Sequence, residues 1–428
     1  MEVLRFASLR RLIDSYGAYA GALLVRGMEL VGKLGLYMLA ARLLGTHDAG
    51  LFFLCLTWIG LAATLARAGF EKAVVRHMAA ELAIGKTREA RAAMLTGLMW
   101  VCVGGVVASV ATIAFADPVS LHIFSDAGLA WPLIVASAAI LPQALCIYAG
   151  HVLYGYHRGV AGQFVQNALW PVLTLLAMVA GVHSLDGMLY TLAATNALAA
   201  LLGLALIARQ RTMPAVPSDE AGTLPSLWRT AFPLGIVEVV QVSLNSIPLL
   251  ILAVFATPSD VGAFSIASRL SMLIWVVIIS IGTIAAPSFA ALHRLKDWAG
   301  LRAQNRKARL MVVLCGIPPI ALMMIFPVQI LKIVGPGFEI AAGALIIMCL
   351  GQLVNCLLSC QDIVLAMTGH GGLLRWLNAG QLASCCILGA ILIPAFGMTG
   401  AAVLTAIVIA QGAIGTALMV RRLMPQAF

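Results

Sequence analysis

The sequence predicts an all-α polytopic membrane protein with twelve transmembrane helices, built as two six-helix lobes. Composition, recurring apolar runs and the distribution of positive charge predict this fold class. Of the 428 residues, 62% are apolar and 10% are charged, whereas about a quarter of the residues in soluble domains are charged. Apolar runs of about twenty residues, the length that crosses a bilayer as a helix, recur along the whole chain. A bilayer is therefore the expected solvent.

Hydropathy and charge together give the expected topology. The predicted spans are 17–43, 49–69, 92–115, 129–154, 162–182, 186–208, 230–256, 262–290, 308–331, 340–366, 372–394 and 399–420. Most of the 27 basic residues fall in every second loop, and the opposite loops contain only Lys332. The positive-inside rule then places both termini in the cytoplasm. Membrane topology thus accounts for the net charge of +10, and no nucleic-acid partner is expected.

An internal repeat relates the two halves of the sequence. A shift of 212 residues brings DAGLF at 48–52 onto DVGAF at 260–264 and Arg209 onto Arg421. Because each repeat has an even number of helices, the two lobes are expected to share one orientation, as a parallel repeat. The expected division is 1–16 as a cytoplasmic or interfacial N-terminus, 17–208 as the N-terminal lobe, 209–229 as a cytoplasmic linker and 230–428 as the C-terminal lobe.

Polar residues within the predicted spans are the first candidates for function. Three of them, Arg26, Glu29 and Lys33, share one face of the first span. The repeat places Glu238, Gln241 and Asn245 at the equivalent positions of the seventh span. A charged residue at a helix centre costs about 2.5–3.5 kcal/mol against lipid, so these side chains must face protein or water.

Two interpretations of the charged triplet stay open. Arg26, Glu29 and Lys33 have the spacing of an internal salt-bridge ladder on one helix. Their net positive charge, and the repetition of the stripe, instead favour a hydrated substrate cavity between the lobes. Arg269, about two turns inside the eighth span, is a further candidate for binding an anionic ligand.

Other intramembrane residues receive structural or accessory roles. Arg42 and Arg67 lie near helix ends, so their side chains are expected to reach the headgroups. Asp362, in the tenth span, could couple a proton or Na⁺, or could form a hydrogen bond between helices. All nine cysteines fall within spans and are expected to be small core residues. Cys356 and Cys360 share a helix face, but no His or acidic cluster completes a metal site there.

Short motifs across the chain resemble those of a known superfamily. They are LG at 44–45 followed by DAGLF at 48–52, RAGF at 67–70 through Arg76, VLYGYHR at 152–158, DVG at 260–262 with ASRL at 267–270, Pro287, and FGMTGAA at 396–402. In order and spacing they resemble the multidrug/oligosaccharidyl-lipid/polysaccharide (MOP) exporter superfamily, particularly its polysaccharide-transporter branch of Wzx-type flippases.

The resemblance implies a function for the whole chain. Two lobes would alternately open a central cavity and pass an undecaprenyl-diphosphate-linked oligosaccharide from the cytoplasmic to the periplasmic leaflet of the bacterial inner membrane, for synthesis of a cell-surface polysaccharide such as lipopolysaccharide or exopolysaccharide. Its partners would be this lipid-linked oligosaccharide, membrane lipid, and the polymerase and glycosyltransferases of the same pathway. By resemblance Arg269 would hold the anionic headgroup, and Arg26 and Lys33 are assigned to that role by location only.

Two other functional classes fit the sequence less well than a flippase. A multidrug or cation antiporter of the superfamily would need an acidic cavity, whereas the candidates here are net basic. A membrane enzyme, such as a glycan polymerase, would need a long outer loop or an acidic catalytic motif, and neither is evident. We therefore expect no catalytic residues and no cofactor. Glu29, Glu238 and Asp362 are the candidates for coupling transport to H⁺ or Na⁺.

Overall fold

The computed structural model describes residues 2–210 and 226–427, and side chains from Gly21 onward except at positions 283, 371 and 427. The described residues form helices, turns and short connections without a β-strand. Ten helices in this part of the chain are long and apolar enough to cross a membrane. The expectation of an all-α polytopic membrane protein is therefore confirmed. The count of twelve crossings and the side of the termini stay predictions.

The chain forms two compact units. The first contains 1–43 and 55–239, and the second contains 44–54 and 240–428. Helices α1 and α8 are thus each divided between the units. The predicted lobe boundaries stay a prediction, and most of the predicted linker, 211–225, lies outside the described residues.

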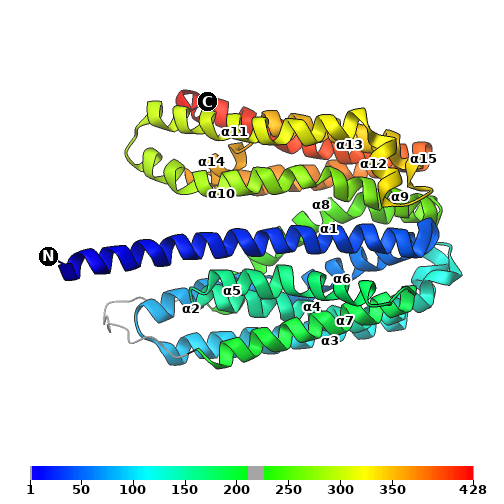
Figure 1. Ribbon diagram of the computed structural model, residues 1–428, viewed down its shortest axis with the longest axis horizontal. Helices are drawn as coiled ribbons and strands as arrows, with labels where there is room; N and C mark the ends of the chain where they lie inside the picture. The colour runs from blue at the N-terminus through cyan, green and yellow to red at the C-terminus, as the bar shows by residue number, and fades with distance from the viewer. Residues whose placement is uncertain (1, 211–225, 428) are drawn as a thin grey trace. The chain divides into compact units, whose positions relative to one another are not determined.

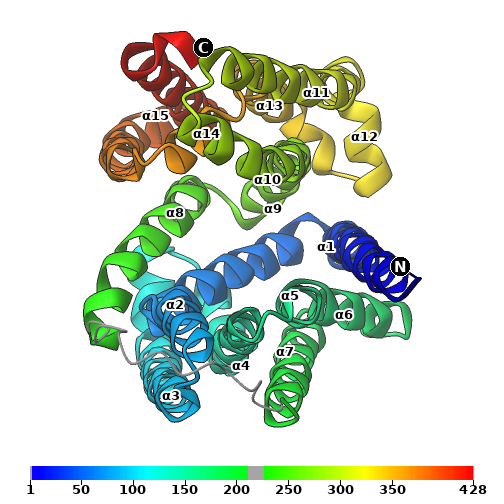
Figure 2. The same ribbon diagram turned by 90° about the vertical axis from the view of Figure 1, so that its left-hand side faces the viewer.

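The first unit is built around α4 (Figures 1 and 2), which packs against α3 and α7. Its helices are α1 (Glu2–Arg67), α2 (Phe70–Ala83), α3 (Thr87–Pro118), η1 (Val119–Ile123), η2 (Ala127–Leu129), α4 (Ala130–Gly155), α5 (Gly159–Gln163), η3 (Phe164–Leu169), α6 (Trp170–Val179) and α7 (Leu185–Ala208). In α4, Tyr148 is fully buried and its hydroxyl donates to the carbonyl oxygen of Met94, 2.5 Å away. This bond satisfies a polar group that would otherwise be costly in an apolar core.

The second unit has α13 at its centre, in contact with α11, α9 and α15. Its helices are α8 (Leu227–Phe255), α9 (Pro258–Ser271), α10 (Leu273–Arg294), α11 (Trp298–Ile325), α12 (Pro327–Val334), η4 (Phe338–Ala341), α13 (Ala342–Leu357), α14 (Gln361–Met367), α15 (Gly371–Leu423) and η5 (Pro425–Ala427). The first turns of α8 pack in the first unit.

Glycines interrupt the two longest helices. Helix α1 breaks at Gly45 and α15 breaks at Gly397, where the backbone φ angles are 72° and 54°. Such positive φ values cost a glycine little and strain other residues. Both glycines lie between two predicted spans, so each break separates segments that hydropathy had already distinguished.

Several helix boundaries differ from the hydropathy prediction. The predicted span 262–290 is two helices, α9 and α10, which meet at Met272. The predicted span 340–366 is also interrupted, because α13 ends at Leu357 and Cys360 has a left-handed φ of 67°. The N-terminal 2–16 segment is helical and continuous with α1, and its location relative to a membrane stays a prediction.

The repeated acidic motif begins α9 and has a local structural role. Thr257 and Asp260 form a reciprocal capping box, in which the Thr257 hydroxyl accepts from the Asp260 amide and the Asp260 carboxylate accepts from the Thr257 amide. Pro258 then occupies the first helical turn, where a missing N–H does no harm. This arrangement fixes the start of α9 and places Gly262 against α1.

The two units each contain a close backbone contact at a glycine. In the second unit, a Cβ on Gly50 would lie 1.8 Å from the carbonyl oxygen of Pro258, and one on Gly262 would lie 2.9 Å from the amide nitrogen of Gly50. In the first unit, a Cβ on Gly69 would lie 2.3 Å from the carbonyl oxygen of Ala231. Side chains at these positions would push the helices apart.

Candidate functional site

The predicted triplet on α1 is an ion-paired cluster. Arg26 Nη1 lies 2.9 Å from Glu29 Oε2, and Lys33 Nζ lies 2.8 Å from Glu29 Oε1. Glu29 is largely buried, at 13% side-chain exposure, whereas Arg26 and Lys33 are partly exposed, at 29% and 30%. The ladder expected from the spacing therefore forms. One carboxylate serves two cations, which leaves a net charge of +1 on two partly exposed basic side chains.

A different face of α1 packs within the first unit. Gly32 approaches Val172 and Gly35 approaches Leu175, and both partners belong to α6. At 100° per residue, these glycines lie roughly 120° around the helix from the charged triplet. The charged cluster therefore does not point toward α6.

The equivalent stripe on α8 is divided. Glu238 belongs to the first unit, where its carboxylate forms an ion pair with Lys72 of α2. Gln241 and Asn245 belong to the second unit and line a cavity there. The structure therefore brings Gln241 and Asn245 together, and it gives Glu238 a different partner that lies 166 residues away in the sequence. The assignment of all these residues to substrate binding stays a prediction.

We expect single charge reversals at the Lys72–Glu238 pair to destabilise the protein and the double reversal to restore it. Lys72→Glu or Glu238→Lys places like charges together, with an expected loss of about 1 kcal/mol because both side chains are partly exposed. The apparent melting temperature of the protein in detergent measures the effect. A double variant no more stable than the singles would contradict the pairing.

The start of α8 makes further contacts in the first unit. Trp228 meets the rings of Phe70 and Trp100 edge-on, with centroid distances of 4.8 and 4.7 Å. His77 Nε2 lies 3.1 Å from the Thr230 hydroxyl. Burial, and then the nearby charge of Arg76, lower the pKa of His77, so a neutral imidazole is favoured in this hydrogen bond. Helix α8 is thus held to α2 and α3 by aromatic and polar contacts.

Arg67 does not have the expected position at the headgroups. The residue is 3% exposed, and its Nε lies 3.6 Å from Glu71 Oε1. Its other guanidinium nitrogens donate to the carbonyl oxygen of Ala63 and to the hydroxyl of Thr64, at 3.0 and 3.1 Å. The expectation that it snorkels is wrong, because a buried carboxylate is available one turn away. Arg42 is exposed, and its contact with headgroups stays a prediction.

Arg269 lies in the last turn of α9. Its guanidinium carbon is 5.0 Å from the ring centroid of Phe53, within the range of a cation–π contact. A cation at a helix C-terminus is also favoured by the helix dipole. Arg269 is half-buried, and its role in ligand binding stays a prediction.

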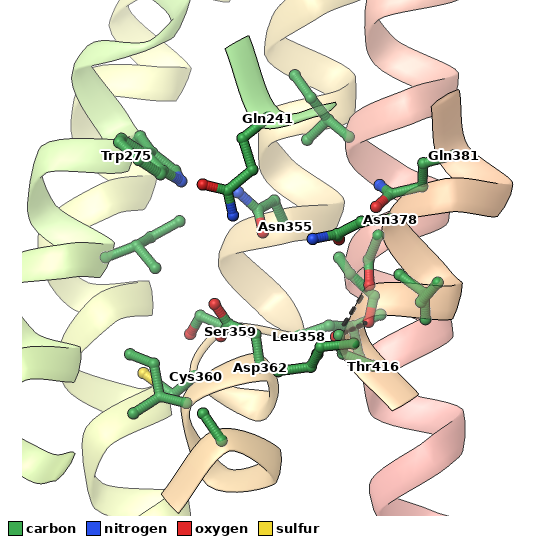
Figure 3. Close-up of a pocket in the computed structure, with 18 of the residues that line it drawn as sticks. Gln241, Trp275, Asn355, Leu358, Ser359, Cys360, Asp362, Asn378, Gln381 and Thr416 are labelled. Carbon is green, nitrogen blue, oxygen red and sulfur yellow. Dashed lines mark hydrogen bonds between the residues drawn. The ribbon is translucent and has the colours of Figure 1, made fainter. Parts of the chain in front are cut away.

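The second unit contains a cavity of about 470 Å³ (Figure 3), lined by residues of α8, α10, α13, α14 and α15. Three predicted residues line it: Gln241, Asn245 and Asp362. The other polar lining residues escaped the sequence analysis, namely Gln352, Asn355, Ser359, Asn378, Gln381 and Thr416. Gln352, Asn355 and Ser359 have the same spacing as the charged triplet, i, i+3, i+7. This repeated spacing is the feature of the sequence from which the polar lining could have been predicted.

The cysteines give no sign of a metal centre. Among the described residues, no group of three or more His, Cys, Asp or Glu side chains could hold a metal ion. All nine cysteines are free thiols. Cys356 is buried and its thiol lies 3.4 Å from the carbonyl oxygen of Val312. Cys315 and Cys386 differ from the expectation of core residues, because both are exposed.

Comparison with known proteins identifies the family. The sequence model of the family described as polysaccharide biosynthesis protein matches residues 20–293, more than half of the chain. The chain belongs to this family. No curated protein sequence matches it.

Solved structures share the fold of this polysaccharide biosynthesis family member. A multidrug resistance MATE family transporter of the MOP superfamily, inward-facing, aligns with a TM-score of 0.73 and 16% identity over 94% of this chain and 97% of its own. The lipid II flippase MurJ, inward closed, aligns with a TM-score of 0.76 and 13% identity over 94% and 87%. A MOP superfamily transporter from Pyrococcus furiosus, described as having a binding pocket of reverse polarity, aligns with a TM-score of 0.63 and 16% identity over 94% and 93%. The fold that the resemblance to the MOP superfamily implied is confirmed, and identities this low show the fold alone.

Proposed function

We propose that this polysaccharide biosynthesis family member is a flippase that moves an undecaprenyl-diphosphate-linked oligosaccharide from the cytoplasmic to the periplasmic leaflet of a bacterial inner membrane. The observation that carries the proposal is the charged cluster on α1. Arg26 and Lys33 share one carboxylate within an apolar helical segment of 47 residues, Gly21–Arg67. Net positive charge in such a segment suits an anionic ligand, and a diphosphate is the anionic part of this substrate.

The proposed transport step is alternating access, without a catalytic step. Arg26 and Lys33 bind the diphosphate, with Arg269 as a further candidate, while the polyprenyl tail stays in lipid. Moving about two negative charges outward is favoured by an inside-negative potential, by roughly 2.3 kcal/mol per charge per 100 mV. Glu29, Glu238 and Asp362 are the proposed groups for coupling to H⁺ or Na⁺. The product would pass to a polymerase or another glycan-transferring enzyme at the periplasmic surface.

Removing the two cations of the α1 cluster tests the proposal. We expect Arg26→Gln with Lys33→Gln to lower the translocation rate of a diphosphate-linked oligosaccharide at least tenfold, because each charge-assisted hydrogen bond contributes about 1.5–3 kcal/mol. The measurement is the appearance of the oligosaccharide headgroup on the opposite face of proteoliposomes, detected with a membrane-impermeant lectin.

Arg42→Gln is the matched control, because Arg42 is an exposed arginine on the same helix. We expect it to translocate at the wild-type rate. Equal rates for the wild type and the double variant, at equal protein levels, would contradict the role of the cluster. Wild-type protein that exported cationic drugs and left the lipid-linked oligosaccharide in place would contradict the proposed function and support an antiporter.

A further inference from the structure

The cavity in the second unit is lined by neutral amides on three helices. Gln241 lies on α8, Asn355 on α13, and Asn378 and Gln381 on α15. Figure 3 shows the side chains of Gln241, Asn355 and Asn378 directed toward the same space, with the indole of Trp275 on one side of it. The volume of about 470 Å³ lies within the usual range for small-ligand sites.

The amides have unused hydrogen-bonding capacity. In the described part of the chain, the side-chain amides of Gln241 and Asn378 make no hydrogen bond. Asn355 Nδ2 donates to Gln352 Oε1 at 3.3 Å, and its own carbonyl oxygen stays available. Gln381 Nε2 donates to the carbonyl oxygen of Val408 at 2.9 Å, which holds this side chain in place. Each amide can both donate and accept, so the cavity matches a ligand whose groups do both.

The charge of the cavity excludes one class of ligand. No Lys, Arg or His is among the described residues that line it, and Asp362 is the lining carboxylate. A carboxylate or phosphate held here would find no basic side chain in the lining, which is unfavourable at low dielectric. The cavity thus differs from the α1 cluster, where two cations share one carboxylate.

Trp275 completes the set of contacts that a sugar ring requires. Trp275 belongs to α10 and is 55% exposed. An indole offers a broad apolar face together with one N–H donor. A pyranose ring has an apolar C–H face and a rim of hydroxyl groups that donate and accept, so it matches an aromatic face flanked by amides.

We propose that this amide pocket, defined by Gln241, Trp275, Asn355, Asn378 and Gln381, binds an uncharged sugar ring, with hydroxyl or acetamido substituents, of the transported glycan. The inference rests on the proposed flippase function and deepens it. It assigns the glycan to neutral-sugar chemistry at this position and excludes uronic or other acidic sugars from it.

Binding of matched lipids to the full-length protein in nanodiscs tests this assignment. The probes are undecaprenyl diphosphate alone, the same lipid carrying N-acetylglucosamine, and the same lipid carrying glucuronic acid, with dissociation constants measured by native mass spectrometry. We expect the wild type to bind the N-acetylglucosamine lipid about tenfold more tightly than either other lipid. A tenfold ratio of dissociation constants corresponds to the net free energy of one or two hydrogen bonds.

Variants connect this preference to the pocket. Asn355→Ala with Asn378→Ala is expected to reduce the preference for the N-acetylglucosamine lipid to about one. Asn378→Asp, which keeps the size of the side chain, is expected to reduce it also, because a carboxylate cannot donate. Gln329→Ala, an exposed amide on α12 outside the pocket, is the matched control and is expected to keep the full preference.

The outcomes separate this inference from the proposed function. Wild-type protein that bound all three lipids equally, or preferred the glucuronic acid lipid, would overturn the amide pocket while leaving the flippase proposal intact. Variants that folded, as judged by gel filtration, and retained the preference would also overturn it. Wild-type protein that bound none of the lipids would overturn both.

Discussion

Replacing Gly50 by alanine is expected to destabilise the protein by about 3 kcal/mol, the upper end of the usual cost of overpacking. The added Cβ would lie 1.8 Å from the carbonyl oxygen of Pro258. Backbone cannot rotate away as a flexible side chain can, so the helices must separate. Gly262→Ala is expected to act in the same direction, because its Cβ would lie 2.5 Å from the carbonyl oxygen of Thr46. The apparent melting temperature in detergent provides the measurement.

Gly60→Ala is the matched control on the same helix. Nothing lies within 4 Å of a Cβ at Gly60. Alanine is favoured over glycine inside a helix by about 0.5–1 kcal/mol, so this variant is expected to be slightly more stable than the wild type. If Gly50→Ala and Gly60→Ala melted at the same temperature, the close approach of α1 and α9 would be refuted.

Breaking the buried Arg67–Glu71 pair is expected to cost about 3–5 kcal/mol, because either single substitution leaves an unpaired charge in the core. The two side chains are 4% and 1% exposed. The double variant Arg67→Met with Glu71→Leu removes both charges and retains most of the volume. We expect it to be more stable than Arg67→Met or Glu71→Leu alone, as measured by thermal unfolding in detergent.

The exposed Arg42 again supplies a control for loss of positive charge. Arg42→Met is expected to change the melting temperature little, since exposed charges contribute little to stability. If Arg67→Met and Glu71→Leu were each as stable as the wild type, the conclusion that the Arg67–Glu71 pair stabilises the core would be wrong.

Hydropathy and charge predicted the fold class because bilayer crossing requires long apolar helices, and such helices leave a strong local signal. The break at Gly45 also has a local signature in the Leu44-Gly45 motif. The breaks near Cys360 and Met272 have none. Cys360 adopts a left-handed conformation that is uncommon for a residue with a side chain, and Met272 separates α9 from α10 without a glycine or proline. Contacts between distant parts of the chain decide where these two helices break, and such contacts cannot be inferred from one sequence.

The candidate site was predictable only as far as charge revealed it. Arg26, Glu29 and Lys33 stood out because lipid excludes charges. Their ion pairs followed from helical spacing. The partner of Glu238 could not be predicted from helical spacing, because Lys72 lies on another helix. Asn355 and Asn378 were missed because a neutral amide is tolerated inside a membrane more readily than a charge, and because their proximity depends on how α13 and α15 pack.

The glycine contact in the second unit has a consequence for the origin of the chain. Under the predicted repeat of 212 residues, Gly50 and Gly262 are two copies of one position, and they touch each other. In an ancestor with a single six-helix repeat, assembled as a symmetric pair, that residue would have met its own copy beside the twofold axis. One mutation there would have placed a side chain on both sides of the contact at once. Once the halves were fused, Gly50 and Gly262 could mutate separately, and a side chain at either position alone would clash with the backbone opposite.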